Sequence, residues 1–329
     1  MAKFDLLRSP SRQRSRGLRG YLWLGFVCIL GLSLAPGAMA QSAVVARGEY
    51  LVRAGGCITC HTASGGVPFA GGRPLATPFG TFYSPNITPD RKTGIGGWSD
   101  ADFLRALRQG IRPDGANYFP VFPYPSFTGI TDEDALTIKA FLFSRAPVHR
   151  PDQPHDISFP FSLRFLQTGW KFLYFREGPF HQNPQWDEAT NRGAYLVTSL
   201  GHCGECHTPR NVLGAMRRNL WLSGTFDGPD GELVPNLTPD ARTGIGDWDQ
   251  TDIVELLKTG ATPYQAKVTG SMHDVVADGT KYLTDADRAA IASYLHAQRP
   301  IARAISASER DNRRWYRRLW DVFMGLIGF

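Results

Sequence analysis

Apolar and polar positions along the chain form short stretches with helical spacing, separated by loops rich in proline and glycine. The pattern predicts one helix that ends at Gly110 and another that ends at Gly260, because glycine readily closes a helix in the left-handed conformation. Thr131 and Thr284 should each begin a further helix, since a hydroxyl suits the N-cap and an aspartate follows three residues later. Little β-strand is expected.

The segments that share this pattern are internal repeats. Residues 85–90 return as residues 235–240, an offset of 235 − 85 = 150. Further pairs at this offset are Thr93 with Thr243, Trp98 with Trp248, Asp102 with Asp252, Leu107 with Leu257 and Gly110 with Gly260. The fold class predicted is therefore mainly α, with one domain in residues 41–146 and a second in residues 188–299.

Each repeat carries the sequence Cys-x-x-Cys-His near its start. The six residues are Cys57, Cys60, His61, Cys203, Cys206 and His207. On one turn of helix both sulfurs reach the two vinyl groups of a haem, and the adjacent imidazole coordinates the iron from one face. The motifs therefore predict two covalently bound haem c groups, with His61 and His207 as iron ligands.

Two other interpretations of the motif are a thioredoxin-like redox pair and a zinc site. A thioredoxin-like redox pair does not need the trailing histidine. A zinc site would have to bring together two CxxC pairs that each lie in their own repeat. Of the five cysteines, Cys28 lies in the N-terminal segment and the other four belong to the motifs, so none is left for a structural disulfide.

The second axial ligand differs between the repeats. Met272 is expected in a loop after the middle helix, where a thioether can bind the second iron, and His273 is the weaker alternative. The corresponding position, 272 − 150 = 122, is Phe122, which cannot bind iron. The first haem therefore has an open or water-bound position covered by Phe122, or it takes a histidine from elsewhere. The histidines considered are His149, His155 and His181.

The two ends of the chain predict export and contact with other molecules. An arginine-bearing start, an apolar run over residues 21–35 and small residues at 38–40 indicate a signal peptide over residues 1–40, cleaved before Gln41. An uncleaved anchor is the alternative, although about 15 apolar residues is short for a membrane span. Residues 300–329 form a basic amphipathic tail that suits a membrane surface, a partner's groove or the protein itself. The predicted location is the periplasm.

Charge and the segment between the repeats complete the organisation. The formal net charge is +6, of which +5 falls on residues 1–40 and +4 on residues 299–329, so residues 41–298 carry 6 − 5 − 4 = −3. Nothing in this balance suggests nucleic-acid binding, which needs a basic patch on the folded part. The connector, residues 147–187, is rich in aromatic residues, unlike a flexible linker, and should pack across both repeats.

These motifs resemble the cytochrome c subunits of periplasmic membrane-associated dehydrogenases of the alcohol and gluconate type. The resemblance covers about residues 45–298 and rests on the segments 86–90, 93–96, 124–127, 192–197 and 201–211. It implies class I cytochrome c-like domains and a catalytic dehydrogenase partner with a quinone, flavin or molybdenum centre. It also implies a quinone, terminal oxidase or soluble cytochrome as electron acceptor. The family commonly has three haems and Met-Pro-Tyr where this chain has Phe122-Pro123-Tyr124, so its axial methionine transfers to Met272 alone.

Three functions are compatible with this sequence. Electron transfer without substrate chemistry is favoured, with electrons passing from the His61 haem to the His207 haem. A peroxidase-like di-haem enzyme would use an open iron in the first repeat, but no distal acid or base is evident near Phe122. A sensor of CO or NO would need an output domain.

Overall fold

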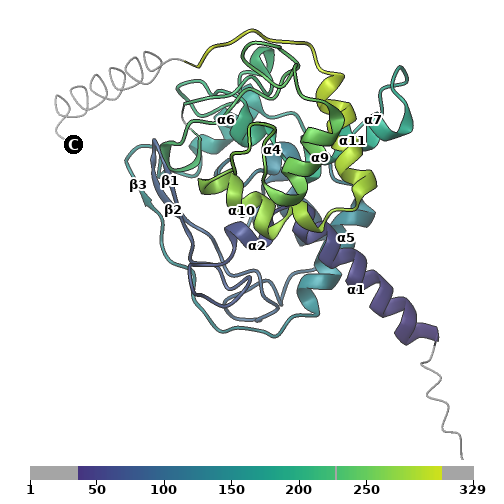
Figure 1. The fold of residues 1–329 in the computed structure, drawn as a ribbon. Coiled ribbons are helices and arrows are strands. Elements are labelled where there is room, and N and C mark those ends of the chain that lie inside the picture. The colour runs from purple at the N-terminus through teal and green to yellow at the C-terminus, as the bar shows by residue number, and fades with distance from the viewer. Residues whose placement is uncertain (1–35, 227, 306–329) are drawn as a thin grey trace, which may run out of the picture.

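The computed structural model describes residues 36–226 and 228–305, and helices dominate them (Figure 1). The first repeat contains α1 (Pro36–Ala54), α2 (Cys57–Cys60), α3 (Asp100–Gln109), α4 (Tyr124–Phe127) and α5 (Asp132–Phe143). The connector contributes α6 (Leu166–Tyr174). The second repeat contains α7 (Glu188–Tyr195), α8 (Gly204–His207), α9 (Gln250–Thr259), α10 (Gly270–Asp278) and α11 (Asp285–His296). The mainly α prediction is confirmed. The predicted signal peptide up to residue 35 and the tail from residue 306 lie outside the described residues.

Shorter elements fill the loops. A π-helix covers η1 (Leu196–Leu200), and 3-10 turns cover η2 (Arg218–Leu220), η3 (Pro229–Gly231) and η4 (Thr280–Tyr282). The strands β1 (Pro74–Thr77), β2 (Gly80–Tyr83) and β3 (Asp156–Ile157) form an antiparallel sheet in that order, with Leu75 opposite Phe82 and Gly80 opposite Ile157. β3 comes from the connector, so the sheet ties this segment to the first repeat.

The predicted capping residues occupy the predicted places. The hydroxyl of Thr131 accepts a hydrogen bond from the Asp134 N–H, and Thr284 makes the equivalent bond at the start of α11. Gly110, with φ of 61°, and Gly260, with φ of 79°, end α3 and α9 in the left-handed region. These caps satisfy backbone groups that a helix end leaves without an internal partner.

Each CxxCH motif lies at a short helical turn that is separate from the helix before it. α1 ends at Ala54, the chain turns at Gly55 and Gly56, and α2 then holds the first motif on a separate short turn. In the second repeat the break falls at Gly201 and His202, which has a left-handed φ of 40°. These residues redirect the chain just before the first cysteine of each motif.

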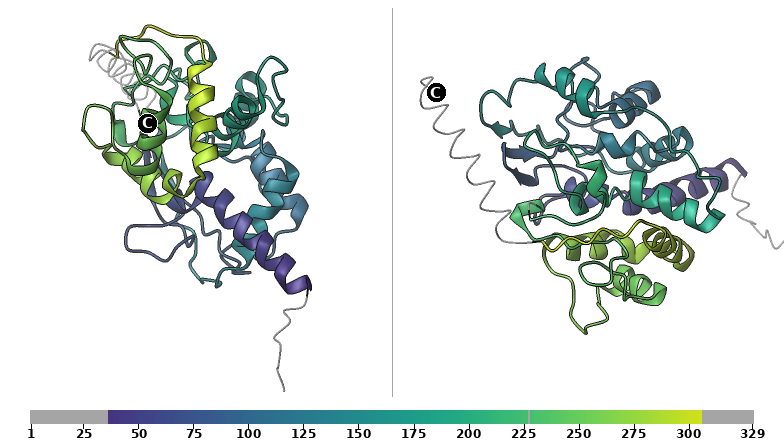
Figure 2. Two further views of the ribbon diagram at one scale, coloured as in Figure 1. Left: turned by 45° about the vertical axis from the view of Figure 1, so that its right-hand side comes forward. Right: turned by 90° about the horizontal axis from the view of Figure 1, so that it is seen from above.

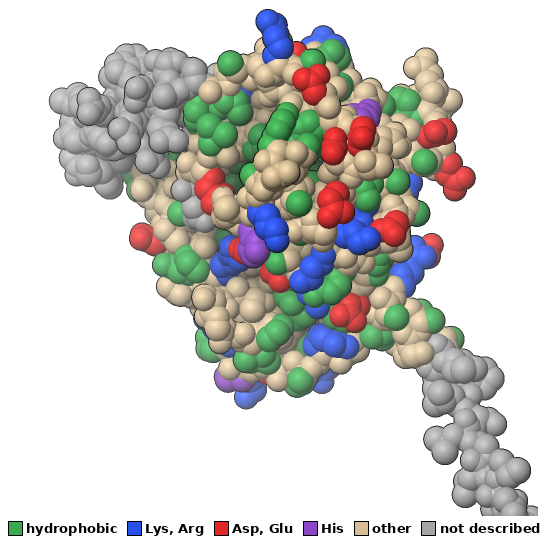
Figure 3. All heavy atoms as spheres, in the orientation of Figure 1, with side chains coloured by type: hydrophobic (Ala, Val, Ile, Leu, Met, Phe, Trp, Pro, Cys, Tyr) green, Lys and Arg blue, Asp and Glu red, His purple; other side chains and the backbone are tan. Residues whose placement is uncertain are grey.

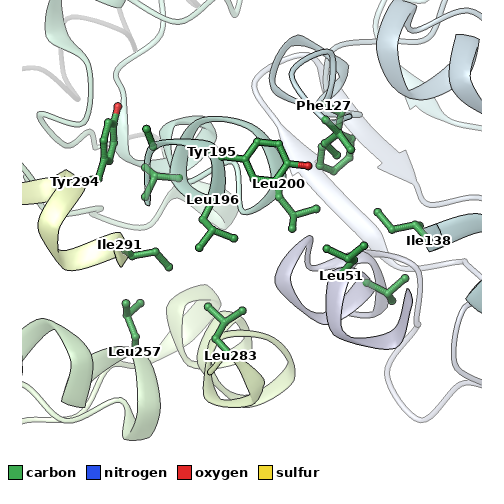
Figure 4. Packing of buried hydrophobic residues seen from close by; sticks show 14 of the residues in the cluster. Leu51, Phe127, Ile138, Tyr195, Leu196, Leu200, Leu257, Leu283, Ile291 and Tyr294 are labelled. Carbon is green, nitrogen blue, oxygen red and sulfur yellow. The ribbon is translucent and has the colours of Figure 1, made fainter. Parts of the chain in front are cut away.

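Buried apolar side chains of both repeats form one cluster (Figure 4). α1 packs on α5 and α7 packs on α11. Gly48 and Gly193 permit this close packing, because a Cβ atom would collide with the carbonyl oxygens of Thr137 and Ala290, respectively. The blue helices of the first repeat and the green and yellow helices of the second lie on opposite sides of the molecule (Figure 2, right).

The repeats exchange hydrogen bonds reciprocally. Tyr50 of α1 donates to Asp287 of α11 over 2.5 Å, while Tyr195 of α7 donates to Asp134 of α5 over 2.7 Å. Asp287 also accepts two bonds from Arg192 of its own repeat. Each repeat thus supplies a tyrosine to an aspartate of the other.

The connector contacts both repeats. The Phe180 ring packs against Tyr195, and the Trp186 ring packs against Tyr294, both in the second repeat. Phe175 packs against Tyr124 of the first repeat. These contacts connect the repeats through side chains as well as through the chain itself.

Candidate functional site

The first motif is presented on α2, a single turn that follows Gly56. Cys57 and Cys60 lie at its two ends, and His61 closes it by donating its backbone N–H to the Cys57 carbonyl over 2.9 Å. Burial raises the pKa of the Cys57 thiol to about 12 and raises that of Cys60 as well. Both sulfurs are therefore neutral thiols before any covalent reaction.

The second motif has the same arrangement. Cys203 precedes α8, and Cys206 and His207 lie within it. Burial raises the pKa of Cys203 to about 11 and that of Cys206 to about 12. Glu205, between the cysteines, accepts a hydrogen bond from Ser126 over 2.7 Å and pairs with Arg210, and these two contacts fix the position of its carboxylate.

Both motif histidines are oriented by a proline carbonyl. His61 Nδ1 lies 2.8 Å from the Pro85 oxygen, and His207 Nδ1 lies 2.8 Å from the Pro235 oxygen. A carbonyl only accepts, so Nδ1 carries the proton and the lone pair belongs to Nε2. Burial lowers the pKa of His207 to about 4 and also lowers that of His61, which keeps both rings neutral. A neutral imidazole oriented in this way fits an axial haem ligand.

The loops that supply these carbonyls are held by repeated polar contacts. Asn86 accepts from both the N–H and the hydroxyl of Thr88, at 2.9 and 2.7 Å, and Asn236 and Thr238 repeat the arrangement. The Asn86 amide donates to the carbonyl of Val148 over 2.7 Å, which closes the loop against the connector. Sequence reasoning found this repeat but did not identify its carbonyls as the partners of the histidines.

Asp90 and Asp240 have a structural role in the same loops. Asp90 Oδ1 accepts from the N–H and the hydroxyl of Thr93, at 2.7 and 2.8 Å, and Asp240 does the same for Thr243. These bonds close a turn in each repeat.

Met272 lies in the first turn of the helix α10 instead of the loop that the sequence predicted. Its side chain is partly buried against the core. Glu232 accepts from the Ser271 N–H over 3.1 Å at the helix start, and Arg73 of the first repeat donates to Asp274 over 3.0 Å. α10 is thus held from both sides. The adjacent His273 is exposed.

The structure also places the residues considered for the first haem. Phe122 is partly buried in the turn before α4, with its ring against those of Tyr118 and Phe127. His155 accepts from the Tyr83 N–H over 3.2 Å and lies among aromatic rings. His149 lies 3.5 Å from Asp90 with an exposed side chain, and His181 is exposed.

The two motifs lie side by side. His202, directly before Cys203, has its Nε2 3.3 Å from the carbonyl oxygen of Gly55, two residues before the first motif. Cys60 is close enough to Cys206 to contribute to the raised pKa of its thiol. The hydroxyl of Thr59 lies 3.4 Å from Asp278 of α10. Sequence reasoning missed His202, because Gly56 occupies the equivalent position before Cys57 and the repeat therefore gave no signal there.

A zinc cage would need the motif side chains to converge, and within residues 36–226 and 228–305 no group of three or more His, Cys, Asp or Glu side chains is arranged to hold a metal ion. Of the helices in these same ranges, none has the length and apolarity required to cross a membrane.

Known proteins resemble the chain over most of its length. A "Diheme cytochrome c-type" protein from Cereibacter sphaeroides is 44% identical over 262 residues, which cover 76% of this chain and 84% of the relative. The chain belongs to this family of c-type cytochromes. Membership implies covalently bound haem c, and the relative's name supports two haems. No protein-family model matches the chain.

Cytochrome subunits of dehydrogenases are also similar to it. The gluconate 2-dehydrogenase cytochrome c subunit of Pantoea cypripedii is 42% identical over 264 residues, and the cytochrome c subunit of the quinone-dependent alcohol dehydrogenase of Gluconacetobacter polyoxogenes is 43% identical over 285 residues. The matches cover 78% and 84% of this chain but 60% of each relative. The chain therefore spans about three fifths of the length of these subunits.

Proposed function

We propose that the chain is a periplasmic electron-transfer protein with two class I cytochrome c-like domains in tandem. It takes electrons from a catalytic dehydrogenase subunit and passes them to a quinone, a terminal oxidase or a soluble cytochrome. The observation that carries the proposal is the pair of adjacent CxxCH turns, each with a buried neutral histidine oriented by a proline carbonyl.

The chain's own residues would hold and tune the cofactors. The four motif cysteines would anchor the two haems, and the Nε2 atoms of His61 and His207 would coordinate the two irons. Met272 supplies the second ligand in the second repeat. Bound haem c supplies a one-electron carrier, and the buried core fixes the separation of the two carriers. No residue of the chain is assigned a role in substrate chemistry.

The difference in ligands would give the electrons a direction. Methionine opposite histidine raises the potential of a haem, and the first repeat has Phe122 where the second has Met272. The His61 haem should therefore have the lower potential and pass its electrons to the His207 haem. A redox titration in which the His61 haem has the higher potential would contradict this direction.

The proposal is tested by purifying the haem-loaded chain and mixing it with a purified catalytic dehydrogenase subunit from the same organism. On addition of the dehydrogenase substrate, the absorbance of both haems should change to the reduced form within the turnover time of the enzyme. A second sample that lacks the dehydrogenase should stay oxidised. If the dehydrogenase turns over and the haems remain oxidised, the proposed function is wrong.

A further inference from the structure

One face of α6 anchors this helix to the rest of the protein. Trp170 donates its indole N–H to the Leu213 carbonyl over 2.9 Å, and its ring packs against Tyr124. Lys171 donates to the carbonyls of Gln109 and Gly110, at 2.6 and 3.0 Å. These contacts fix which side of α6 faces outward.

The outward side of α6 is apolar. Phe165, Leu166, Phe172 and Leu173 are spaced at i, i+1, i+7 and i+8, which places them on one helical face. Phe172 is 86% exposed, Phe165 69% and Leu173 63%. A Cβ atom added at Gly169, between them on this face, would meet nothing within 4 Å.

A neighbouring loop extends this surface. Val212 is 64% exposed and Leu213 is 44% exposed, and the bond from Trp170 to the Leu213 carbonyl holds the loop against α6. We call the six residues the α6 patch: Phe165, Leu166, Phe172, Leu173, Val212 and Leu213. Single exposed apolar residues are ordinary, but a group of this size marks a protein–protein or membrane interaction site.

Arginines border the α6 patch. Arg176 and Arg218 line a cleft of about 340 Å³ together with Leu173, and Arg217 is exposed beside them. None of the three forms an ion pair with another described residue. The acidic neighbours have polar partners: Glu177 accepts from Gln109, and Glu205 pairs with Arg210.

The α6 patch and the arginines beside it form a surface that is both apolar and basic. Acidic and basic side chains are interspersed on the face in Figure 3. Beside the α6 patch, the three arginines form no ion pair with a described residue, whereas the acidic Glu177 and Glu205 have polar partners of their own. We propose that the α6 patch lies in the interface of a lipid bilayer, with the apolar side chains among the acyl chains and the arginines against anionic headgroups. A partner protein or a second copy of the chain would instead need an apolar surface complementary to the α6 patch.

This contact would bring one haem motif close to the membrane. The cleft beside the α6 patch is also lined by Glu205, which lies between the two cysteines of the second motif. One consequence rests on the proposed function: the second haem would then transfer its electrons near the bilayer. Membrane binding itself requires no electron transfer, so the two are tested separately.

The test uses the full mature, haem-loaded chain and vesicles of phosphatidylcholine with or without phosphatidylglycerol. The double variant Phe172→Glu with Leu173→Glu should bind anionic vesicles about tenfold more weakly than the parent, because it places two charges in the apolar interface. The matched control, Val67→Glu with Tyr264→Glu, makes the same charge change at exposed apolar positions outside the α6 patch and should bind like the parent. Co-sedimentation measures the binding.

Hydrogen exchange separates the α6 patch from the tail. Anionic vesicles should slow amide exchange in the peptide spanning residues 164–176 of the parent chain. Equal vesicle binding by the parent and the α6 double variant, with no change of exchange in this peptide, would overturn the proposal. If sedimentation shows instead that the parent dimerises and the α6 double variant does not, a second copy covers the patch and the proposal is also wrong.

Discussion

The structure defines the tautomer of the two motif histidines, His61 and His207. The CxxCH motif indicates which residues hold haem, but it does not indicate the partner of the other ring nitrogen. That partner is a backbone carbonyl of Pro85 or Pro235, 24 or 28 residues away in the chain. Its position depends on the loop fold, so no local pattern predicts it.

Met272 gives the most direct prediction at the residue scale. Replacing it with leucine should lower the midpoint potential of the second haem by roughly 0.1 to 0.3 V, part of the range of about 0.8 V that axial ligands span. The physical reason is the loss of the thioether, which stabilises ferrous iron. Spectroelectrochemical titration of the purified protein measures the change.

Met216→Leu provides the control for this prediction, because Met216 lies in the cleft beside α6 and is not expected to bind iron. Its two midpoint potentials should equal those of the parent. Unchanged potentials in the Met272 variant would remove this residue from the ligand set and leave the second haem to another side chain.

Among the elements, the helices with strong caps and the helical turns at the CxxCH motifs could be predicted, whereas the start of α10 and the sheet could not. Thr131, Thr284, Gly110 and Gly260 define ends through their own hydroxyls or backbone conformation, so local sequence is sufficient. α10 begins where Glu232, from a distant loop, accepts the Ser271 N–H. The sheet similarly needs β3 of the connector, so its existence depends on tertiary contacts.

Close helix packing makes Gly193 sensitive to substitution. Gly193→Ala should lower the free energy of unfolding by about 1–3 kcal/mol, because the added methyl group collides with the Ala290 carbonyl between α7 and α11. Thermal unfolding of the haem-loaded protein measures this. Gly178→Ala is the control, since its Cβ would meet nothing within 4 Å; equal losses in both variants would contradict the packing described.

Asp287 couples stability to pH. Burial alone raises the pKa of this carboxyl, but hydrogen bonds from Arg192 and Tyr50 outweigh burial and leave the pKa below its usual value. Its stabilising effect should therefore be complete above the unfolded pKa, near 3.8, and disappear as pH falls through the lower folded pKa. Asp287→Asn should cost about 1–3 kcal/mol at neutral pH.

Thermal melts between pH 7 and pH 3 measure the Asp287 contribution. The difference between parent and Asp287→Asn should shrink as pH falls below about 4, and the exposed Asp247→Asn should behave like the parent throughout. A difference that stays constant with pH would mean that the charge of Asp287 does not stabilise the contact between the repeats.

At the scale of the whole molecule, the offset of 150 residues indicated two equivalent segments but not their contact. The reciprocal bonds from Tyr50 and Tyr195 are made between repeats. A sequence comparison shows that both tyrosines are present, but it does not show that each binds an aspartate of the other repeat. The one apolar cluster that spans both repeats is likewise visible only in the structure.

The haems should contribute much of the apolar core, so the chain made without them should be poorly folded. Replacing all four motif cysteines by serine should reduce the helical circular dichroism signal and speed digestion by protease. Replacing Cys28 by serine, in the N-terminal segment, should change neither. A cysteine-free chain as helical and resistant as the parent would show that the fold does not require the cofactor.

The central claim is that this chain holds two haem c groups covalently through its two CxxCH turns. Intact mass spectrometry of the protein, denatured after expression with the cytochrome c maturation machinery, tests it most directly. The predicted mass is that of the polypeptide plus two haems. The mass of the bare polypeptide, or of the polypeptide with one haem, would contradict the claim.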